Sequence, residues 1–132
     1  MTVTENKRKY FMTSPLYRRY MEIRRVLPRG FIPFMKIGEW YETYGDMAEV
    51  ASPILGATLH PRGGTVVCEF PEKKVDTYLA KLVRCGKSVA LCGVDEEDPV
   101  DEEDPMNVNI RFVVQRIVNY PRFGYHPKRG ED

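Results

Sequence analysis

The 132-residue sequence has no apolar run close to the ~18 residues of a membrane-spanning helix, and its first residues lack the apolar segment of a signal peptide. These absences predict a cytoplasmic protein with no membrane partner. Only three cysteines are present, Cys68, Cys85 and Cys92, an odd number without a C-x-x-C pair. We interpret them as reduced, mostly buried thiols, with a catalytic cysteine as the alternative.

The motifs of enzyme sites are also lacking. The chain has no P-loop and no paired nucleophile and base, and its two histidines, His60 and His126, have no metal-ligand spacing. We therefore expect a protein that is not an enzyme, that is independent of ATP, and that holds neither a metal nor another cofactor. The composition, 42% hydrophobic and 30% charged, suits one soluble globular domain.

One segment has no basic side chain at all. Residues 95–104, DEEDPVDEED, hold eight carboxylates, and with Glu131 and Asp132 they account for ten of the nineteen acidic residues. The formal net charge of +1 therefore conceals a basic body of about +11 and one acidic loop. Three interpretations of the loop stay open: a solvated loop, a DNA-mimicking arm that screens the basic face or binds a basic partner, and a calcium site. The last lacks the spacing of an EF-hand.

Three segments have apolar residues at helical spacing together with start and stop signals. The expected helices are 14–27, 46–55 and 73–85. In the first, Thr13 or Ser14 suits the cap and Pro15 suits the first helical position. After the third, Gly86 suits a left-handed position that ends a helix.

The middle helix has mixed signals. Asp46 and Glu49 have the spacing of a capping box, and Gly56 is the expected stop. Pro53, inside the segment, predicts a kink or an early end.

Strand-like segments alternate with these helices. The expected strands are 31–37, 41–44, the two arms of a hairpin over 57–70, 88–94 and 107–118. Pro33 within the first strand favours an edge or a bulge. Gly38 begins a turn that carries Trp40. The order of elements predicts an α+β fold in which helices pack around a mixed sheet.

Four quoted segments resemble one known family in its own order. They are SPLYRRYMEIRRVLP (14–28), FMKIGEWYETYGDMAEVAS (34–52), TLHPRG (58–63) and VDTYLAKLVRCGKSVALC (75–92). Together they resemble the N-terminal, mismatch-recognising domain of the DNA mismatch-repair protein MutS, over about four-fifths of the chain. The ATPase and clamp of that family do not fit in 132 residues, so we expect a stand-alone domain.

The resemblance divides the chain into three parts. We expect a basic N-terminal arm over 1–12, a MutS domain I-like domain over 13–120 with the acidic loop at 95–105, and a C-terminal tail over 121–132.

The family's aromatic-x-glutamate motif falls on Trp40, Tyr41 and Glu42. The resemblance implies that Trp40 stacks beside a mispaired or unpaired base and that Glu42 forms a hydrogen bond with it. Such an aromatic wedge must be flat, apolar and exposed, and its insertion kinks the duplex. The family normally has phenylalanine at this position, and a core tryptophan is the alternative interpretation of Trp40.

Three basic residues are candidates for contacts to the DNA backbone. Lys36 precedes the motif on the same strand, Arg62 lies in a hairpin turn, and Lys81 lies on the segment with the strongest resemblance. Each also suits a solvent-facing position. The predicted function is a DNA-binding module for mismatched or distorted duplex, related to mismatch repair. The alternative is a protein-interaction module that has lost DNA binding and uses the exposed aromatic residue and the acidic loop to bind a partner protein.

Overall fold

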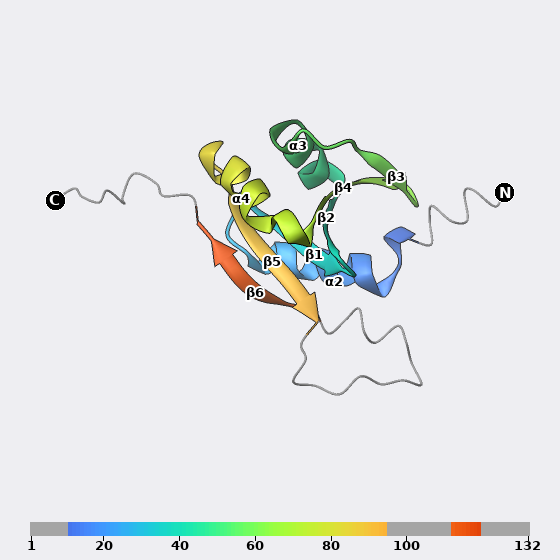
Figure 1. Ribbon diagram of the computed structural model, residues 1–132. Coiled ribbons are helices and arrows are strands. Elements are labelled where there is room, and N and C mark those ends of the chain that lie inside the picture. Colours follow the sequence, from blue (N-terminus) through green and yellow to red (C-terminus); the bar gives the residue numbers. More distant parts are fainter. Residues whose placement is uncertain (1–10, 95–111, 120–132) are drawn as a thin grey trace.

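The computed structural model describes residues 11–94 and 112–119. Its helices are α2 (Pro15–Val26), α3 (Gly45–Leu55), the short 3-10 helix η1 (Glu72–Lys74) and α4 (Val75–Arg84). Its strands are β1 (Phe31–Ile37), β2 (Trp40–Tyr44), β3 (His60–Arg62), β4 (Thr65–Pro71), β5 (Ser88–Val94) and β6 (Phe112–Val118) (Figure 1). The three predicted helices and the strand at 88–94 are therefore confirmed.

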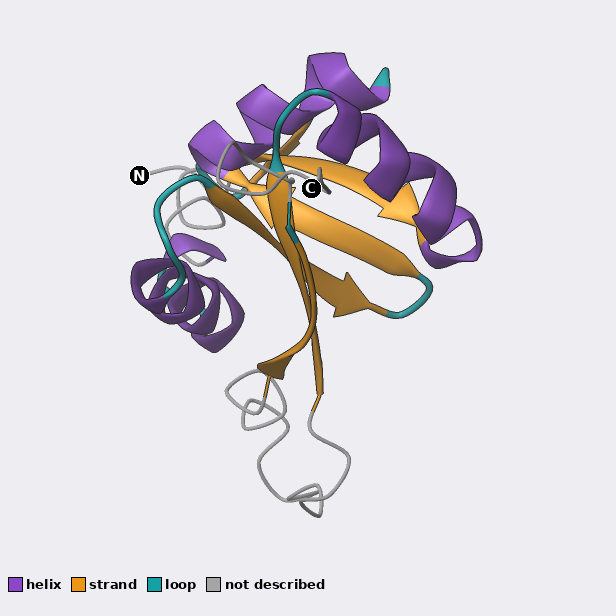
Figure 2. Ribbon diagram, turned by 90° about the vertical axis from the view of Figure 1, so that its left-hand side faces the viewer, coloured by secondary structure: helices purple, strands orange, loops and turns teal. Residues whose placement is uncertain are grey.

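The strands form one mixed sheet in the order β3-β4-β2-β1-β5-β6. β1 and β5 are parallel, and the other neighbouring pairs are antiparallel. Helices α3 and α4 cover one face of the sheet and α2 lies against the other (Figure 2). This arrangement confirms the predicted α+β class.

Both faces of the sheet are buried, and each has its own core. Phe34 and Phe70 point toward α3 and α4, where Leu82 joins them, whereas Met35 and Val67 point toward α2. Neighbouring residues along a strand face opposite sides, which explains why the alternate residues of β1 and β4 divide between the two cores.

Helix α2 is fixed to the sheet near the wedge motif. Ser14 caps the helix, since its Oγ accepts from the backbone N–H of Tyr17 at 3.2 Å. The Tyr20 hydroxyl lies 2.9 Å from Thr43 Oγ1 and donates to the carbonyl of Tyr44 at 3.2 Å. These bonds hold β2 against α2, so the strand that begins at Trp40 is firmly supported.

The predicted capping box of α3 is wrong. The helix begins at Gly45 without a side-chain cap, so Asp46 lies inside its first turn. There the carboxylate accepts two hydrogen bonds of 2.7 Å from Arg24 of α2. A negative charge in the first turn still suits the helix dipole.

The two prolines predicted to interrupt elements are tolerated. Helix α3 runs past Pro53 to Leu55, so the early end is wrong, and Gly56 follows with φ 69° as predicted. β1 is central, so the predicted edge position of Pro33 is also wrong. β1 pairs with β2 only over Met35–Ile37, and Pro33 lies outside that ladder, where a missing N–H costs no bond to β2.

Candidate nucleic-acid interface

Trp40 lies at the end of the sheet formed by the β1–β2 turn. β1 ends at Ile37, Gly38 turns the chain with φ 62°, and Trp40 is the first residue of β2. Trp40 pairs with Ile37 on one side and with Pro71 on the other. The residue is 44% exposed, which confirms an accessible tryptophan rather than a core one. A strand paired on both sides gives this ring a rigid base.

Glu42 lies two residues along β2 and therefore on the same face as Trp40. Its side chain is only 6% exposed. Oε1 accepts from Arg62 Nη1 and from the Tyr44 hydroxyl, both at 2.8 Å, and Oε2 accepts from Arg62 Nη2 at 3.3 Å. A buried carboxylate needs such partners, because desolvating an unpaired charge is costly.

Phe11 completes this group, which we call the Glu42 cluster: Phe11, Glu42, Tyr44 and Arg62. The Arg62 guanidinium lies 5.7 Å from the centroid of the Phe11 ring, and that ring lies 5.3 Å from the ring of Tyr44. Burial, followed by the nearby charge of Glu42, raises the pKa of Tyr44 well above its ordinary value. The Tyr44 hydroxyl is therefore a permanent donor to Glu42 at neutral pH.

A second carboxylate lies directly across from Glu42. Glu69 of β4 is its partner in the β2–β4 register, and His60 Nε2 lies 3.9 Å from Glu69 Oε2. Like charges directly opposite each other destabilise a sheet, and Arg62 offsets this repulsion. The sequence prediction missed Glu69 because the pairing of β4 with β2 is a long-range contact. The available signal was its position two residues after Val67 on the same hairpin arm, since residues two apart on a strand share a face.

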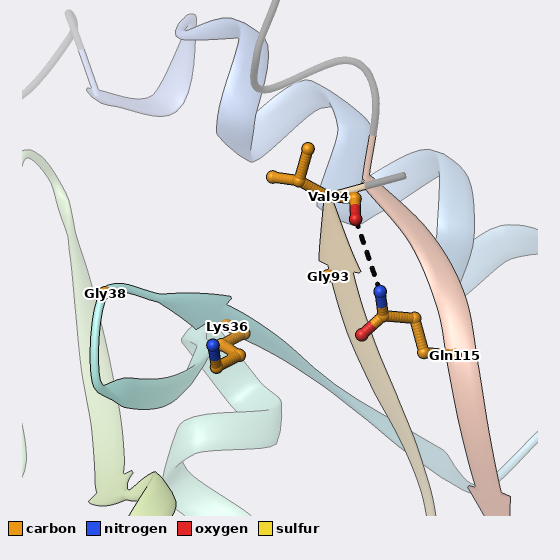
Figure 3. Close-up of a pocket in the computed structure, with 5 residues that line it drawn as sticks. All are labelled: Lys36, Gly38, Gly93, Val94 and Gln115. Carbon is orange, nitrogen blue, oxygen red and sulfur yellow. Dashed lines mark hydrogen bonds between the residues drawn. The ribbon is translucent and has the colours of Figure 1, made fainter. Parts of the chain in front are cut away.

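Lys36 shares this end of the sheet but not this face. It pairs with Tyr41 and lies between Met35 and Ile37, so its side chain points away from the face that carries Trp40. It contacts Glu72 at 3.6 Å. It also lines a cavity of about 290 Å³ together with Gly38, Gly93, Val94 and Gln115 (Figure 3).

Lys81 lies farther away, on the helical layer. Its Nζ is 5.2 Å from the centroid of the Tyr78 ring and 3.5 Å from the carbonyl oxygen of Leu55. The structure therefore brings together Trp40, Glu42 and Arg62, and it separates Lys36 and Lys81 from them. Contacts of all five residues with DNA stay predictions.

The acidic loop at 95–104 lies outside the described residues, and so do the interpretations that depend on it. The residues on either side of the undescribed segment 95–111 are placed: Val94 pairs with Phe112 at the end of the β5–β6 ladder. Because β5 is parallel to β1, with Cys92 opposite Met35, Val94 lies at the same end of the sheet as the β1–β2 turn. The last described residue before the acidic segment, Val94, therefore lies at the end of the sheet that carries Trp40.

The thiols behave as the sequence predicts at two of three positions. Cys68 and Cys92 are buried, and burial raises the pKa of Cys68 to about 11 and that of Cys92 to about 12. Cys85 is free and exposed after α4. Within residues 11–94 and 112–119, no group of three or more metal-binding side chains is found. In the same part of the chain, no helix has the length and hydropathy to span a membrane.

These features define a small α+β domain that presents an exposed tryptophan beside a charged cluster on one face of its sheet. Residues 14–119 match the family model of MutS domain I, and the chain belongs to that family. It is 43% identical over 96 residues to the DNA mismatch repair protein MutS of Flavobacterium psychrophilum. The matched region covers 69% of this chain and 11% of that protein.

Other relatives give the same result. The chain is 42% identical over 98 residues to the MutS protein of Flavobacterium johnsoniae, across 70% of this chain and 11% of that protein. It is 36% identical over 109 residues to the MutS protein of Rhodopseudomonas palustris. This match covers 79% of the present chain and 12% of that protein. The chain thus spans about a tenth of the length of the curated relatives it matches.

Proposed function

We propose that this chain is a mismatch-repair-related module that binds DNA and stacks Trp40 at mismatched or distorted sites. The observation that carries the proposal is the position of Trp40, 44% exposed at the end of a strand that is paired on both sides. Membership of the MutS domain I family and the names of the relatives support the choice of DNA as the partner.

The energetics favour damaged or mispaired sites. Stacking an aromatic side chain on a base is worth ~1–3 kcal/mol, and opening a well-stacked base step costs a few kcal/mol. The gain from the indole of Trp40 is roughly constant, whereas the cost falls where pairing is already defective. Preference for defects follows without any sequence-specific contact.

Glu42 would act as a partly occupied acceptor. Oε1 already accepts two hydrogen bonds, but Oε2 accepts only the longer bond of 3.3 Å from Arg62. A carboxylate oxygen has about two acceptor sites, so Oε2 is the atom through which Glu42 would accept a hydrogen bond from DNA.

Contacts with the DNA backbone would come from basic side chains, and two of these already have acidic partners within the domain. Arg62 and Lys36 both have acidic partners within the domain, at 2.8 Å and 3.6 Å. Binding phosphate through either residue would share its charge between the phosphate and that acidic partner. We place the proposed action in the cytoplasm, without catalysis and without ATP.

A second candidate function rests on the same ion pairs, those of Arg62 with Glu42 and of Lys36 with Glu72. If Arg62 and Lys36 keep their carboxylate partners, Trp40 remains accessible while the neighbouring cations are neutralised. That surface suits a partner protein with an apolar patch, and the eight carboxylates of residues 95–104 would favour a basic partner.

The test uses the intrinsic fluorescence of Trp40, the only tryptophan in the chain. The full chain is titrated with matched, mismatched and single-base-bulged duplexes at two salt concentrations. Stacking should quench the indole most strongly with bulged DNA, and affinity should fall with salt, in a Kd range of ~10⁻⁴ to 10⁻⁶ M. Emission that no duplex changes, together with no salt-dependent binding, would support the protein-interaction candidate instead.

A further inference from the structure

Glu69 occupies the same face of the sheet as the wedge motif. In the β2–β4 register, Glu69 lies opposite Glu42 and Pro71 lies opposite Trp40. Opposite residues in an antiparallel pair share a face with Cβ atoms ~4.5–5.5 Å apart, and diagonal neighbours lie ~7–8 Å apart. Glu69 is thus a diagonal neighbour of Trp40, within reach of a base that stacks on the indole.

The two carboxylates differ in availability. Glu42 is 6% exposed and accepts three hydrogen bonds from Arg62 and Tyr44. Glu69 is 26% exposed, and among the described residues its recorded ionic partner is His60 at 3.9 Å, beyond hydrogen-bond distance. Glu69 therefore has acceptor capacity that Glu42 has largely used.

We propose that Glu69 is a specificity-determining residue of the DNA site, where its carboxylate accepts a hydrogen bond from the base held against Trp40. This inference rests on the proposed function. The ligand class is an unpaired or mispaired nucleotide whose exposed edge presents an N–H donor, as thymine does at N3 and guanine at N1. A base edge with acceptors alone meets repulsion from the same carboxylate.

Arg62 allows the two acidic side chains to coexist. Its guanidinium lies across β4 from β3 to Glu42, so a positive charge lies beside the Glu42–Glu69 pair. Because one carboxylate is paired with Arg62, the repulsion between the two is reduced, and the second stays available near the wedge.

The test compares two bulged duplexes that differ in one N–H group. Each contains a single extra nucleotide, either thymine or N3-methylthymine, and the full chain is titrated into both labelled duplexes. A hydrogen bond to a charged group predicts that the parent prefers thymine roughly tenfold. Glu69→Ala should reduce this ratio toward one, and Glu69→Gln should retain part of it, because its amide oxygen still accepts.

Glu49→Ala is the matched control, since Glu49 is an exposed carboxylate on α3. It should leave the ratio unchanged. If Glu69→Ala strengthens binding to both duplexes by the same factor, Glu69 only repels phosphate and the inference is overturned. Unfolding curves of both Glu69 variants check that the fold is intact, and Glu69→Gln serves as the milder variant.

Two variants, Trp40→Ala and Glu69→Ala, distinguish a failure of this inference from a failure of the proposed function. If Trp40→Ala loses the preference for bulged DNA while Glu69→Ala keeps the thymine ratio, the wedge stands and Glu69 has no role in reading the base. If Trp40→Ala binds both bulged duplexes as the parent does, the wedge fails and the role of Glu69 fails with it.

Discussion

Arg62 holds Glu42 across β4 through two hydrogen bonds of 2.8 and 3.3 Å. The last residue of a three-residue edge strand thus sets the state of the motif glutamate two strands away. Glu42 uses two of the five N–H donors of Arg62, so a phosphate would have to bind through the remaining three and share the guanidinium with Glu42. The cation and the carboxylate of the candidate interface are therefore one unit.

Removing Arg62 should destabilise the domain. Arg62→Ala leaves Glu42 buried with only the Tyr44 hydroxyl as a donor, and breaking a buried ion pair costs ~3–5 kcal/mol. Because the Arg62 side chain is 35% exposed, we expect a smaller loss, about 2 kcal/mol, in the free energy of unfolding measured with urea.

The pairing itself is tested by a double-mutant cycle. Arg62→Ala combined with Glu42→Gln should cost less than the sum of the two single changes, because the second change removes the stranded charge. Additive losses would mean that the two side chains do not interact in solution.

The ion pair between α2 and α3 predicts a pH dependence. Hydrogen bonding from Arg24 lowers the pKa of Asp46 below its ordinary value. The stabilisation is therefore present at neutral pH and is lost as the pH falls through the lowered pKa. Because the Asp46 side chain is 63% exposed, Asp46→Asn should cost at most about 1 kcal/mol at pH 7.

Thermal unfolding from pH 7 to pH 2 measures this effect. The parent and Asp46→Asn should converge in stability at the acidic end, and Glu49→Gln, on the same helix, is the control. A difference between the parent and Asp46→Asn that stays constant over the whole range would contradict the ion pair.

The acidic loop should weaken nucleic-acid binding. Replacing the eight carboxylates of residues 95–104 with asparagine and glutamine keeps the loop length and raises the formal net charge of the chain from +1 by these eight charges. Carboxylates repel phosphate, and Val94, directly before this segment, lies at the Trp40 end of the sheet. Duplex affinity should rise, and more at low salt than at high salt. Unchanged affinity at both salt concentrations would mean that the loop is only solvated.

Local signals in the sequence predicted the elements well. The cap at Ser14 and the left-handed positions at Gly56 and Gly86 depend on neighbouring residues alone, and each is confirmed. The hairpin turn predicted over 61–64 is shorter than expected: Gly63 and Gly64 form it, whereas Pro61 and Arg62 belong to β3. Pro53 and Pro33 misled the prediction because tertiary position decides whether a missing N–H matters.

The site was predictable only in part. The motif located Trp40 and Glu42, and the exposure of Trp40 is confirmed. The bonds from Arg62 to Glu42 and the position of Glu69 opposite Glu42 depend on which strands pair, and local spacing does not encode that choice. The alternation of β1 also turned Lys36 to the opposite face, although the strand brings it to the expected end of the sheet.

The most direct measurement is the binding of labelled bulged and matched duplexes to the parent, Trp40→Ala and Trp40→Phe. The parent should prefer the bulge, Trp40→Phe should keep most of that preference, and Trp40→Ala should lose it, with a loss in bulge affinity that reflects ~1–3 kcal/mol of stacking. Because Trp40 is 44% exposed, its loss should leave the unfolding curve nearly unchanged. Equal binding of bulged DNA by Trp40→Ala and the parent would contradict the wedge.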